Sequence, residues 1–330
     1  MKILILRFSS IGDIVLTTPI LRCIKNQLKD VELHYATKKA FSSIVTNNAH
    51  VDQVHVLENN LNHLISKLKN ENFDVVIDLH KNLRSLKIKK SLNTKSHSFP
   101  KLNLKKWLVV NTKVNKLPDA HIVDRYFQAV QRLGVKNDNL GLDFHIPKKS
   151  FIAIEDDFNS NKIICIAVGA KFNTKQIPLK ILQEIITPVS DTIVLLGGKE
   201  DYEKGEELRN SLPEHTIFNT CGHYSLLSSA SIVQQAKALI TADTGLMHIA
   251  SAFDTPIVSI WGNTIPEFGM YPYRPSKPDS YSIHQVENLK CRPCSKIGFD
   301  KCPKKHFKCM ENQDIEAIQN SLSTIVSRNE

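Results

Sequence analysis

The residues best suited to chemistry follow a short apolar run over 238–241. Asp243, Thr244 and Gly245 come next, and a short helix is expected directly after them. The first N–H groups of a helix lack partners within the helix and carry partial positive charge, so this turn can bind a phosphate group. Gly245 lets the backbone approach a ligand closely, and His248 can face the same side of the helix as Thr244. The alternative is an ordinary connection with a capping aspartate and a packed histidine.

A second reactive group lies near the N-terminus. Residues 2–7 read as a strand, and Ser9-Ser10-Ile11-Gly12-Asp13 follows as a polar turn before a helical pattern. A strand, a Gly-containing turn and a helix in this order form a ligand-binding opening, in which Asp13 can also simply cap the helix. The turn is neither a dinucleotide fingerprint nor a phosphate-binding P-loop, because G-x-G-x-x-G and G-x-x-x-x-G-K-[ST] are both absent.

Polar residues also follow three other expected strands. His80 to Ser85 come after the strand at 74–79, residues 169–178 after the strand at 163–168, and Gly197-Gly198-Lys199-Glu200 after the strand at 192–196. Ligands of open parallel sheets bind at the carboxyl ends of the strands, so these loops are candidate sites. The alternatives are a solvated loop at 80–85 and a helix-starting glutamate at Glu200.

These loops need a large parallel αβ framework to position them. The chain has 330 residues, of which 42% are hydrophobic, enough for two domains. We expect a first domain at 1–150, a second at 151–330, and a final helix at about 314–326 that packs back on the first. Pro19 interrupts the helical pattern after Asp13 and should kink that helix or lie near its start.

The charge is unevenly distributed. The net charge is +10, but residues 1–150 carry +13 and the remainder carries −3. Residues 81–116 contain eleven Lys or Arg and no Asp or Glu. This segment should attract a nucleic acid, an anionic membrane surface or a phosphorylated acceptor. Trp107 lies among its lysines, which suits either a membrane interface or a solvated loop with one packed aromatic.

The N-terminus and the cysteines bear on localisation and cofactors. No run approaches 18 apolar residues, and the apolar start is too short for a signal peptide, so we expect a cytoplasmic protein. A cytosolic setting argues against structural disulfides. Four of the seven cysteines could together hold a structural zinc ion, or stay as free thiols. These four are Cys291, Cys294, Cys302 and Cys309.

Several motifs resemble those of glycosyltransferase family 9, the ADP-heptose:lipopolysaccharide heptosyltransferases. D-T-G-x-x-H-x-A-x-A followed by P-x-V-x-x-[FW]-G-x-T is similar to the donor-site signature of that family, with Asn263 where the family usually has proline. R-x-S-S-x-G-D-x-x-x-x-x-P resembles its opening motif, D-L-x-x-x-x-R-S its acceptor-side motif, and H-x-x-x-R a further position. T-K-x-x-P resembles the opening of the second domain, with Ile177 replacing the usual aromatic. The matches run in order along both halves.

The resemblance implies a role for each matched residue. Asp13 would be the catalytic base, and Lys175 would neutralise the departing diphosphate. The implied donor-binding residues are Thr174, Lys175, Glu200, Asp243, Thr244, Gly245 and His248. The implied acceptor-binding residues are Ser10, Gly12, Lys81, Arg84 and Arg125. The family's chemistry is metal-independent, so no cofactor is expected for catalysis, apart from the structural zinc considered above.

The resemblance also implies an α/β fold of the GT-B class, with two Rossmann-like αβα domains facing across a cleft. The implied activity is inverting transfer of a heptose or related sugar from an ADP-sugar to an anionic lipopolysaccharide-core or lipid A-type acceptor. Such an acceptor lies at the inner face of the cytoplasmic membrane, so a monomer peripheral to that membrane is expected. Alternatives are transfer from another nucleotide-sugar in surface polysaccharide synthesis, a nucleotide-sugar epimerase and, in a different class, a basic nucleic-acid-binding protein. The last lacks any nucleic-acid-binding motif.

Overall fold

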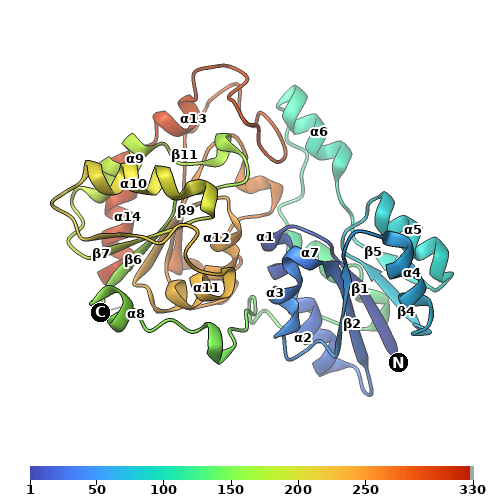
Figure 1. The fold of residues 1–330 in the computed structure, drawn as a ribbon. Helices are drawn as coiled ribbons and strands as arrows, with labels where there is room; N and C mark the ends of the chain where they lie inside the picture. The colour runs from blue at the N-terminus through green and yellow to red at the C-terminus, as the bar shows by residue number, and fades with distance from the viewer. Residues whose placement is uncertain (328–330) are drawn as a thin grey trace. The chain divides into compact units, whose positions relative to one another are not determined.

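The protein folds into two compact α/β units (Figure 1). The computed structural model describes residues 1–327. The first unit contains residues 1–101 and 120–145, and the second contains residues 102–119 and those from 146 onward. The expected domain boundary at residue 150 therefore lies close to the return at 146. The expectation missed the excursion over 102–119, whose contacts belong to the second unit.

The first unit is built on a five-stranded parallel sheet in the order β3-β2-β1-β4-β5. Its strands are β1 (Lys2–Leu6), β2 (Glu32–Lys38), β3 (Gln53–Leu57), β4 (Val75–Asp78) and β5 (Ser96–Ser98). Its helices are α1 (Ile11–Val15), α2 (Thr18–Gln27), α3 (Ser42–Thr46), α4 (Leu61–Lys69), α5 (Leu83–Leu92) and α7 (Ile122–Phe127). The strand order reverses between β1 and β4, where open α/β sheets bind ligands.

The second unit contains a six-stranded parallel sheet in the order β11-β10-β9-β6-β7-β8. Its strands are β6 (Ile163–Ala167), β7 (Thr192–Leu196), β8 (Ile217–Asn219), β9 (Ala238–Ala242), β10 (Ile257–Trp261) and β11 (Tyr281–Gln285). Its helices are α6 (Asn103–Thr112), α8 (Ile154–Phe158), α9 (Leu179–Ile186), α10 (Tyr202–Ser211), α11 (Leu226–Gln235), α12 (Gly245–Ala250), α13 (Lys308–Glu311) and α14 (Ile315–Ser327). Here the order reverses between β6 and β9.

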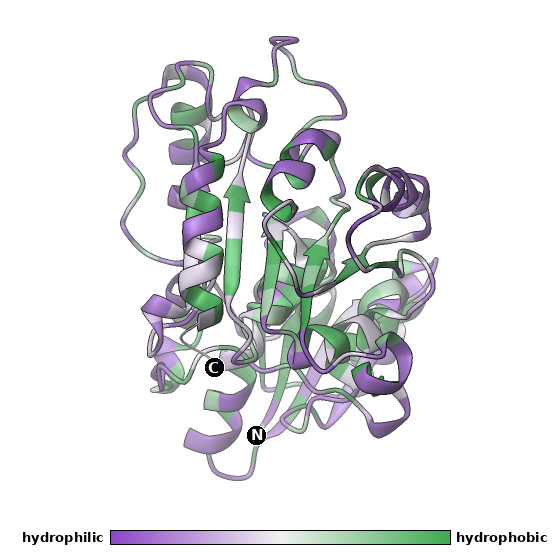
Figure 2. Cartoon of the chain, turned by 90° about the vertical axis from the view of Figure 1, so that its left-hand side faces the viewer, coloured by the Kyte–Doolittle hydropathy of each residue, from purple (hydrophilic) through white to green (hydrophobic). Residues whose placement is uncertain are grey.

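Both faces of the second sheet are covered. Along β6, Ile164 and Ile166 pack into one apolar cluster, while Ile163 and Cys165 pack into another. Successive side chains of a strand point to opposite faces, so a strand buried on both sides reads as a continuous apolar run. Figure 2 shows the same distribution, with hydrophobic strands inside and hydrophilic surfaces on the outer sides of helices.

Pro19 lies near the start of a helix, which is one of the two predicted outcomes. The pattern after Asp13 forms two helices, α1 and α2, and Pro19 lies in the first turn of α2. At that position the missing N–H of proline costs no helical hydrogen bond. α6, by contrast, was not predicted from sequence, because residues 103–112 show no clear apolar period. It forms where Val109 packs against Ile265 and Phe268 of the second unit.

The last helix packs on the second unit. Ile318, Leu322 and Ile325 of α14 are buried in the same apolar cluster as Ile164 and Ile166. The apolar face of this helix is therefore used within its own unit, and the expected packing on the first domain stays a prediction. None of the helices in the described part of the chain combines the length and apolar character needed to span a membrane.

Leu322→Ala should destabilise the second unit. Leu322 is 4% exposed, and removing a buried leucine side chain usually costs about 2–5 kcal/mol of unfolding free energy. Urea unfolding followed by the fluorescence of Trp107 and Trp261, both in the second unit, measures the loss. Ser323→Ala, at an exposed position of the same helix, is the matched control and should change little. Equal stability of the two variants would contradict this packing.

Candidate active site

Asp13 lies at the carboxyl edge of the first sheet, on the α1 segment that follows β1. One carboxylate oxygen is 2.6 Å from a guanidinium nitrogen of Arg7. The other accepts hydrogen bonds from the backbone N–H of Ser10 at 3.1 Å and from the Ser10 hydroxyl at 2.9 Å. The Asp13 side chain retains 25% exposure, against 9% for Arg7. The structure therefore fixes one carboxylate with part of its surface open to solvent.

Arg7 is tied to several parts of the first unit. Its guanidinium donates to the carbonyls of Leu79 at 2.5 Å and Ser9 at 2.8 Å, and to the Tyr126 hydroxyl at 3.0 Å. Burial opposes the ionised form of Asp13, but the Arg7 charge and the Ser10 hydrogen bonds oppose that effect and hold its pKa below the usual range. Asp13 is therefore ionised at neutral pH.

Asp78 organises the loop after β4, which lies beside β1. Its carboxylate accepts hydrogen bonds from the backbone N–H groups of His80 at 3.0 Å and Lys81 at 2.7 Å. It also accepts one from the Ser85 hydroxyl at 2.9 Å and pairs with Lys89 at 2.8 Å. The sequence motif contained this aspartate, but sequence reasoning assigned it no role. Its position at the end of a buried strand was the available signal.

The predicted acceptor residues differ in how they are placed. The ammonium group of Lys81 donates to the Phe99 carbonyl at 3.0 Å, and the guanidinium of Arg84 lies 5.5 Å from the centre of the Phe8 ring. Both residues follow β4, at the same edge as Asp13. Gly12 is buried in α1. Arg125 is only 2% exposed, and burial lowers its pKa. Acceptor binding by these residues stays a prediction.

Lys175 and Asp243 meet at the switch point of the second sheet. Lys175 ends the short 3-10 helix after β6 (Asn173–Lys175), and Asp243 directly follows β9. Their side chains form an ion pair, and the Thr264 hydroxyl donates to the same Asp243 oxygen at 3.0 Å. The two groups neutralise one another in the described structure. Both side chains are mostly buried, at 16% and 12% exposure.

The neighbouring donor-site candidates have defined local roles. Thr244 caps α12, since its hydroxyl accepts a weak hydrogen bond from the N–H of Met247 at 3.4 Å. Gly245 begins that helix, and His248 is buried within it. Thr174 is buried and exchanges hydrogen bonds with Phe299, donating from its hydroxyl to the carbonyl at 2.9 Å and accepting from the N–H at 2.8 Å. The structure thus brings Lys175, Asp243 and the start of α12 to one edge.

Asp201 supports the glycine turn after β7, a role that sequence reasoning missed. Its carboxylate accepts the N–H of Gly198 at 2.8 Å, while the adjacent Glu200 is exposed. A Cβ on Gly169 would overlap the Asp201 carboxylate, and one on Gly197 would lie 2.8 Å from its side chain. Both glycines are therefore required by close packing around Asp201. Burial raises the pKa of Asp201.

The four clustered cysteines are free thiols at the C-terminal side of the second unit. Cys291 Sγ lies 3.7 Å from Nε2 of His306, and Cys294 Sγ donates to the Cys291 carbonyl at 3.1 Å. Burial raises the pKa of Cys309 to about 12. Lys113, after α6, donates to the carbonyls of Cys291 and Pro293. Zinc binding by this segment stays a prediction.

Two Rossmann-like domains with polar loops at the carboxyl edges of their sheets are the architecture of the GT-B glycosyltransferases. The chain belongs to glycosyltransferase family 9 (heptosyltransferase), whose pattern matches residues 61–299. It is 25% identical over 293 residues to lipopolysaccharide heptosyltransferase 1 of Campylobacter coli, covering 80% of this chain and 84% of that one. Family membership sets aside the epimerase and nucleic-acid-binding alternatives.

Solved structures give the same fold. The family 9 glycosyltransferase of Veillonella parvula superposes with a TM-score of 0.79 at 18% identity, covering 99% of this chain and 97% of that one. The ADP-heptose lipopolysaccharide heptosyltransferase II of Escherichia coli superposes with a TM-score of 0.75 at 16% identity, covering 100% and 99%. At these identities the likeness establishes the fold of the chain.

Arg7→Gln should move the acid limb of the activity profile to higher pH. Arg7 stabilises the carboxylate of Asp13, so removing the positive charge raises the pKa of Asp13 and protonates it at a higher pH. With Asp13 as the predicted base, the profile of kcat/KM against pH reports this ionisation in the free enzyme. Tyr126→Phe, which removes a neutral partner of Arg7, is the control and should leave the limb in place. An unchanged limb in Arg7→Gln would exclude this coupling.

Proposed function

We propose that this protein transfers a heptose from ADP-heptose to an anionic acceptor of the lipopolysaccharide core, with inversion at the anomeric carbon. The observation that carries the proposal is the fixed, ionised and partly exposed carboxylate of Asp13 at the switch point of the first sheet. Family membership supports the sugar, and the likeness to the ADP-heptose heptosyltransferase II of E. coli supports the nucleotide. In the proposal, the first unit binds the acceptor and the second binds the donor.

Asp13 acts as the general base. Its lowered pKa makes it a weak base toward a sugar hydroxyl, so the proton is transferred as the acceptor oxygen attacks rather than before. The attacked carbon becomes oxocarbenium-like, as in glycoside hydrolysis, and this makes the hydroxyl more acidic during attack. Ser10 and Arg7 orient the carboxylate toward the acceptor. No metal ion is needed for these steps.

The diphosphate leaving group is stabilised from the second unit. Negative charge develops on its oxygens as the sugar departs, and prearranged donors lower the barrier most when aimed at that charge. Lys175 and the N–H groups at Thr244 and Gly245 supply these donors in the proposal. Because Lys175 is paired with Asp243, its ammonium must share its hydrogen bonds between the carboxylate and the phosphate. His248 and Glu200 complete the donor contacts.

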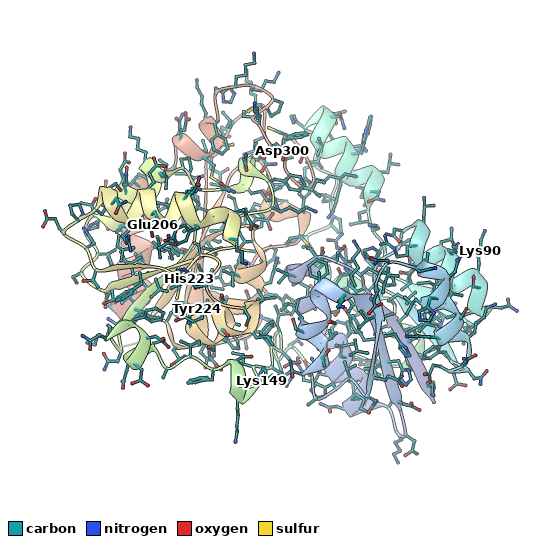
Figure 3. All side chains as sticks on the ribbon, in the orientation of Figure 1. Lys90, Lys149, Glu206, His223, Tyr224 and Asp300 are labelled. Atoms are coloured by element: carbon teal, nitrogen blue, oxygen red, sulfur yellow. The ribbon has the colours of Figure 1, made fainter. Side chains whose placement is uncertain are left out.

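The basic segment suits an anionic glycolipid at the inner face of the cytoplasmic membrane. Lys87 and Lys90 are exposed on α5, where Figure 3 labels Lys90. On α6, Leu104 is 72% exposed and Trp107 is 52% exposed, with lysines at 105 and 106 between them. Exposed apolar side chains beside lysines are typical of surfaces that contact anionic lipid. We propose peripheral membrane contact by a monomer on this basis.

Asp13→Asn should abolish most of the transfer. A placed general base contributes about 10²–10⁴-fold to rate, so kcat should fall by that factor. The measurement is transfer from ADP-heptose to a heptose-deficient lipopolysaccharide acceptor, with ADP binding as the control for folding. ADP affinity should stay within about twofold. A kcat within tenfold of the unaltered protein would remove Asp13 from the catalytic role.

Lys175→Met should weaken ADP binding by about ten- to a hundredfold, the usual value of a charge-assisted hydrogen bond. Thermal stabilisation by ADP measures the effect, since ligand at a hundred times its Kd adds about 2.7 kcal/mol of stability. The double variant Lys175→Met/Asp243→Asn separates a direct contact of Lys175 with phosphate from neutralisation of Asp243 by Lys175. If Lys175 contacts phosphate, the double variant stays weak. Recovery of full affinity would show that Lys175 only neutralises Asp243. If only UDP, GDP or CDP compounds stabilise the protein, the donor carries one of these nucleotides in place of ADP.

A further inference from the structure

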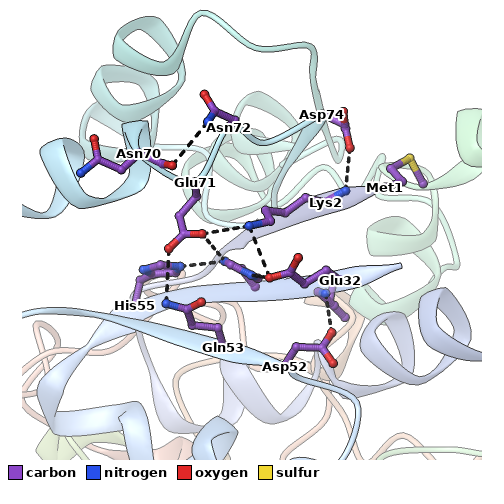
Figure 4. Close-up of polar contacts among 12 residues, drawn as sticks. Met1, Lys2, Glu32, Asp52, Gln53, His55, Asn70, Glu71, Asn72 and Asp74 are labelled. Carbon is purple, nitrogen blue, oxygen red and sulfur yellow. Dashed lines mark hydrogen bonds and ion pairs between the residues drawn. The ribbon is translucent and has the colours of Figure 1, made fainter. Parts of the chain in front are cut away.

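A polar cluster lies at the amino end of the first sheet, remote along the strands from Asp13. The ring nitrogens of His34 Nδ1 and His55 Nε2 are 2.9 Å apart, and the second nitrogen of His34 lies 2.7 Å from a Glu32 oxygen (Figure 4). A Glu71 oxygen lies 4.0 Å from His34 Nδ1 and 3.0 Å from the Lys2 ammonium. His34 is fully buried and His55 is 6% exposed. The candidate active site uses none of these groups.

Strand register brings these side chains together. In the parallel ladder, Leu4 is paired with His34, and His34 with Gln53, two residues before His55. Side chains two residues apart share a face, so His34 and His55 lie on the face that carries Leu4. Further along, this face is apolar and is covered by α4. The amino end of this face is polar, where Lys2, Glu32 and Gln53 accompany the two histidines.

We propose that His34, His55 and Glu71 form a binding site for a divalent transition-metal ion, with Zn²⁺ the best match. One ligand atom from each of these three residues lies within 4.8 Å of the other two. Two imidazole nitrogens and one carboxylate are a ligand set that zinc accepts, with water in the fourth position. Imidazole ligands disfavour Mg²⁺ and Ca²⁺, which take oxygen ligands.

The distances need only a small adjustment. Zinc–nitrogen bonds of about 2.0–2.1 Å in tetrahedral geometry place two ligand nitrogens about 3.3 Å apart. The rings of His34 and His55 therefore have to separate by roughly half an ångström from their hydrogen-bonded distance. The proton between the two ring nitrogens moves from Nε2 to Nδ1 of His55, so that both facing nitrogens present a lone pair to the metal. Glu71 replaces its contact with Lys2 by a contact with the metal.

The surroundings resemble the outer shell of a metal site. Glu32 is positioned to accept the Nε2–H of His34, which leaves Nδ1 with a free lone pair for the metal. Such carboxylate–histidine pairs fix the ring and increase its basicity as a ligand. Phe73 packs edge-on against both imidazole rings, with ring centres 5.1 and 6.1 Å away. A cavity of about 610 Å³ lies beside the cluster and is lined by His55, Gln53 and Lys67 among others.

The ammonium group of Lys2 competes with a metal ion for the carboxylate of Glu71. This ammonium occupies the carboxylate oxygens of Glu71 at 3.0 Å and Glu32 at 3.4 Å, where it neutralises them without a metal. A cation bound at Glu71 would be repelled by this charge. Removing the charge should therefore tighten metal binding, whereas removing a ligand should weaken it. A hydrogen-bonded network without a metal function predicts neither effect.

Zinc binding to the full-length, untagged protein tests the site. Isothermal titration with Zn²⁺ should show a site that weakens at least tenfold in His55→Gln and in Glu71→Gln. Glu32→Gln should weaken it about tenfold, the lower end of the usual effect of an outer-shell partner, and Lys2→Gln should strengthen it. His63→Ala, at an exposed position beside the same cavity, is the matched control and should change nothing.

The cysteine segment requires its own control. Cys294→Ser should leave the histidine site intact, and any zinc bound by thiols would be lost in this variant alone. Co²⁺ distinguishes the two sites, because thiolate ligands add an intense charge-transfer band in the near ultraviolet that nitrogen and oxygen ligands lack. Equal zinc binding by the unaltered protein, His55→Gln and Glu71→Gln would overturn the proposal. Loss of all zinc in Cys294→Ser would overturn it as well.

Discussion

The guanidinium of Arg7 is the interaction on which the first unit's candidate site depends. It joins the end of β1 to the Leu79 carbonyl after β4, to Tyr126 of α7 and to the carboxylate of Asp13. A buried charge is stable only when it is paired and hydrogen-bonded, and Arg7 satisfies both requirements. The same contacts that stabilise the guanidinium therefore fix the position and the charge of the proposed base.

The second unit also contains a mostly buried ion pair, but in this pair the two charges neutralise one another. Lys175 and Asp243 come from loops on either side of the switch point and cancel each other's charge. In the proposed function, diphosphate binding at this edge therefore depends on the backbone N–H groups at the start of α12 and on how Lys175 divides its hydrogen bonds. A self-neutralised pair also limits the electrostatic cost of the site before donor binds. Asp201 adds a second constraint, because its carboxylate fills the space beside Gly169 and Gly197.

The two ends of the first sheet have different chemistry. The carboxyl end carries Asp13 and the loop ordered by Asp78, whereas the amino end carries the histidine pair and Glu71. Between them the face is apolar and packs under α4. A parallel sheet therefore presents two separate polar regions, each made by strand ends that lie far apart in sequence. A metal at the amino end would tie the edge strand β3 to β2 without contacting the reacting groups.

The sequence by itself determined three things. These are the repeating αβ order, the strands that precede the candidate loops, and the family. It did so because buried parallel strands are continuous apolar runs, and because the motifs around Asp13 and Asp243 are local in sequence. Local patterning also indicated that Pro19 either kinks a helix or lies near its start, and it lies in the first turn of α2. The pairing of Lys175 with Asp243 was not readable, since the two residues are 68 positions apart and meet only through the strand order.

Tertiary structure alone decided the remaining assignments. Residues 103–112 lack an apolar period, and their helix forms because Val109 finds Ile265 and Phe268 in the second unit. The last helix has a clear apolar stripe, but a stripe does not specify its partner, and the partner proved to be its own unit. No pattern in the sequence indicates that His34 and His55 lie close together. Parallel register places them on one face, and that long-range pairing is set by the packing of the whole sheet.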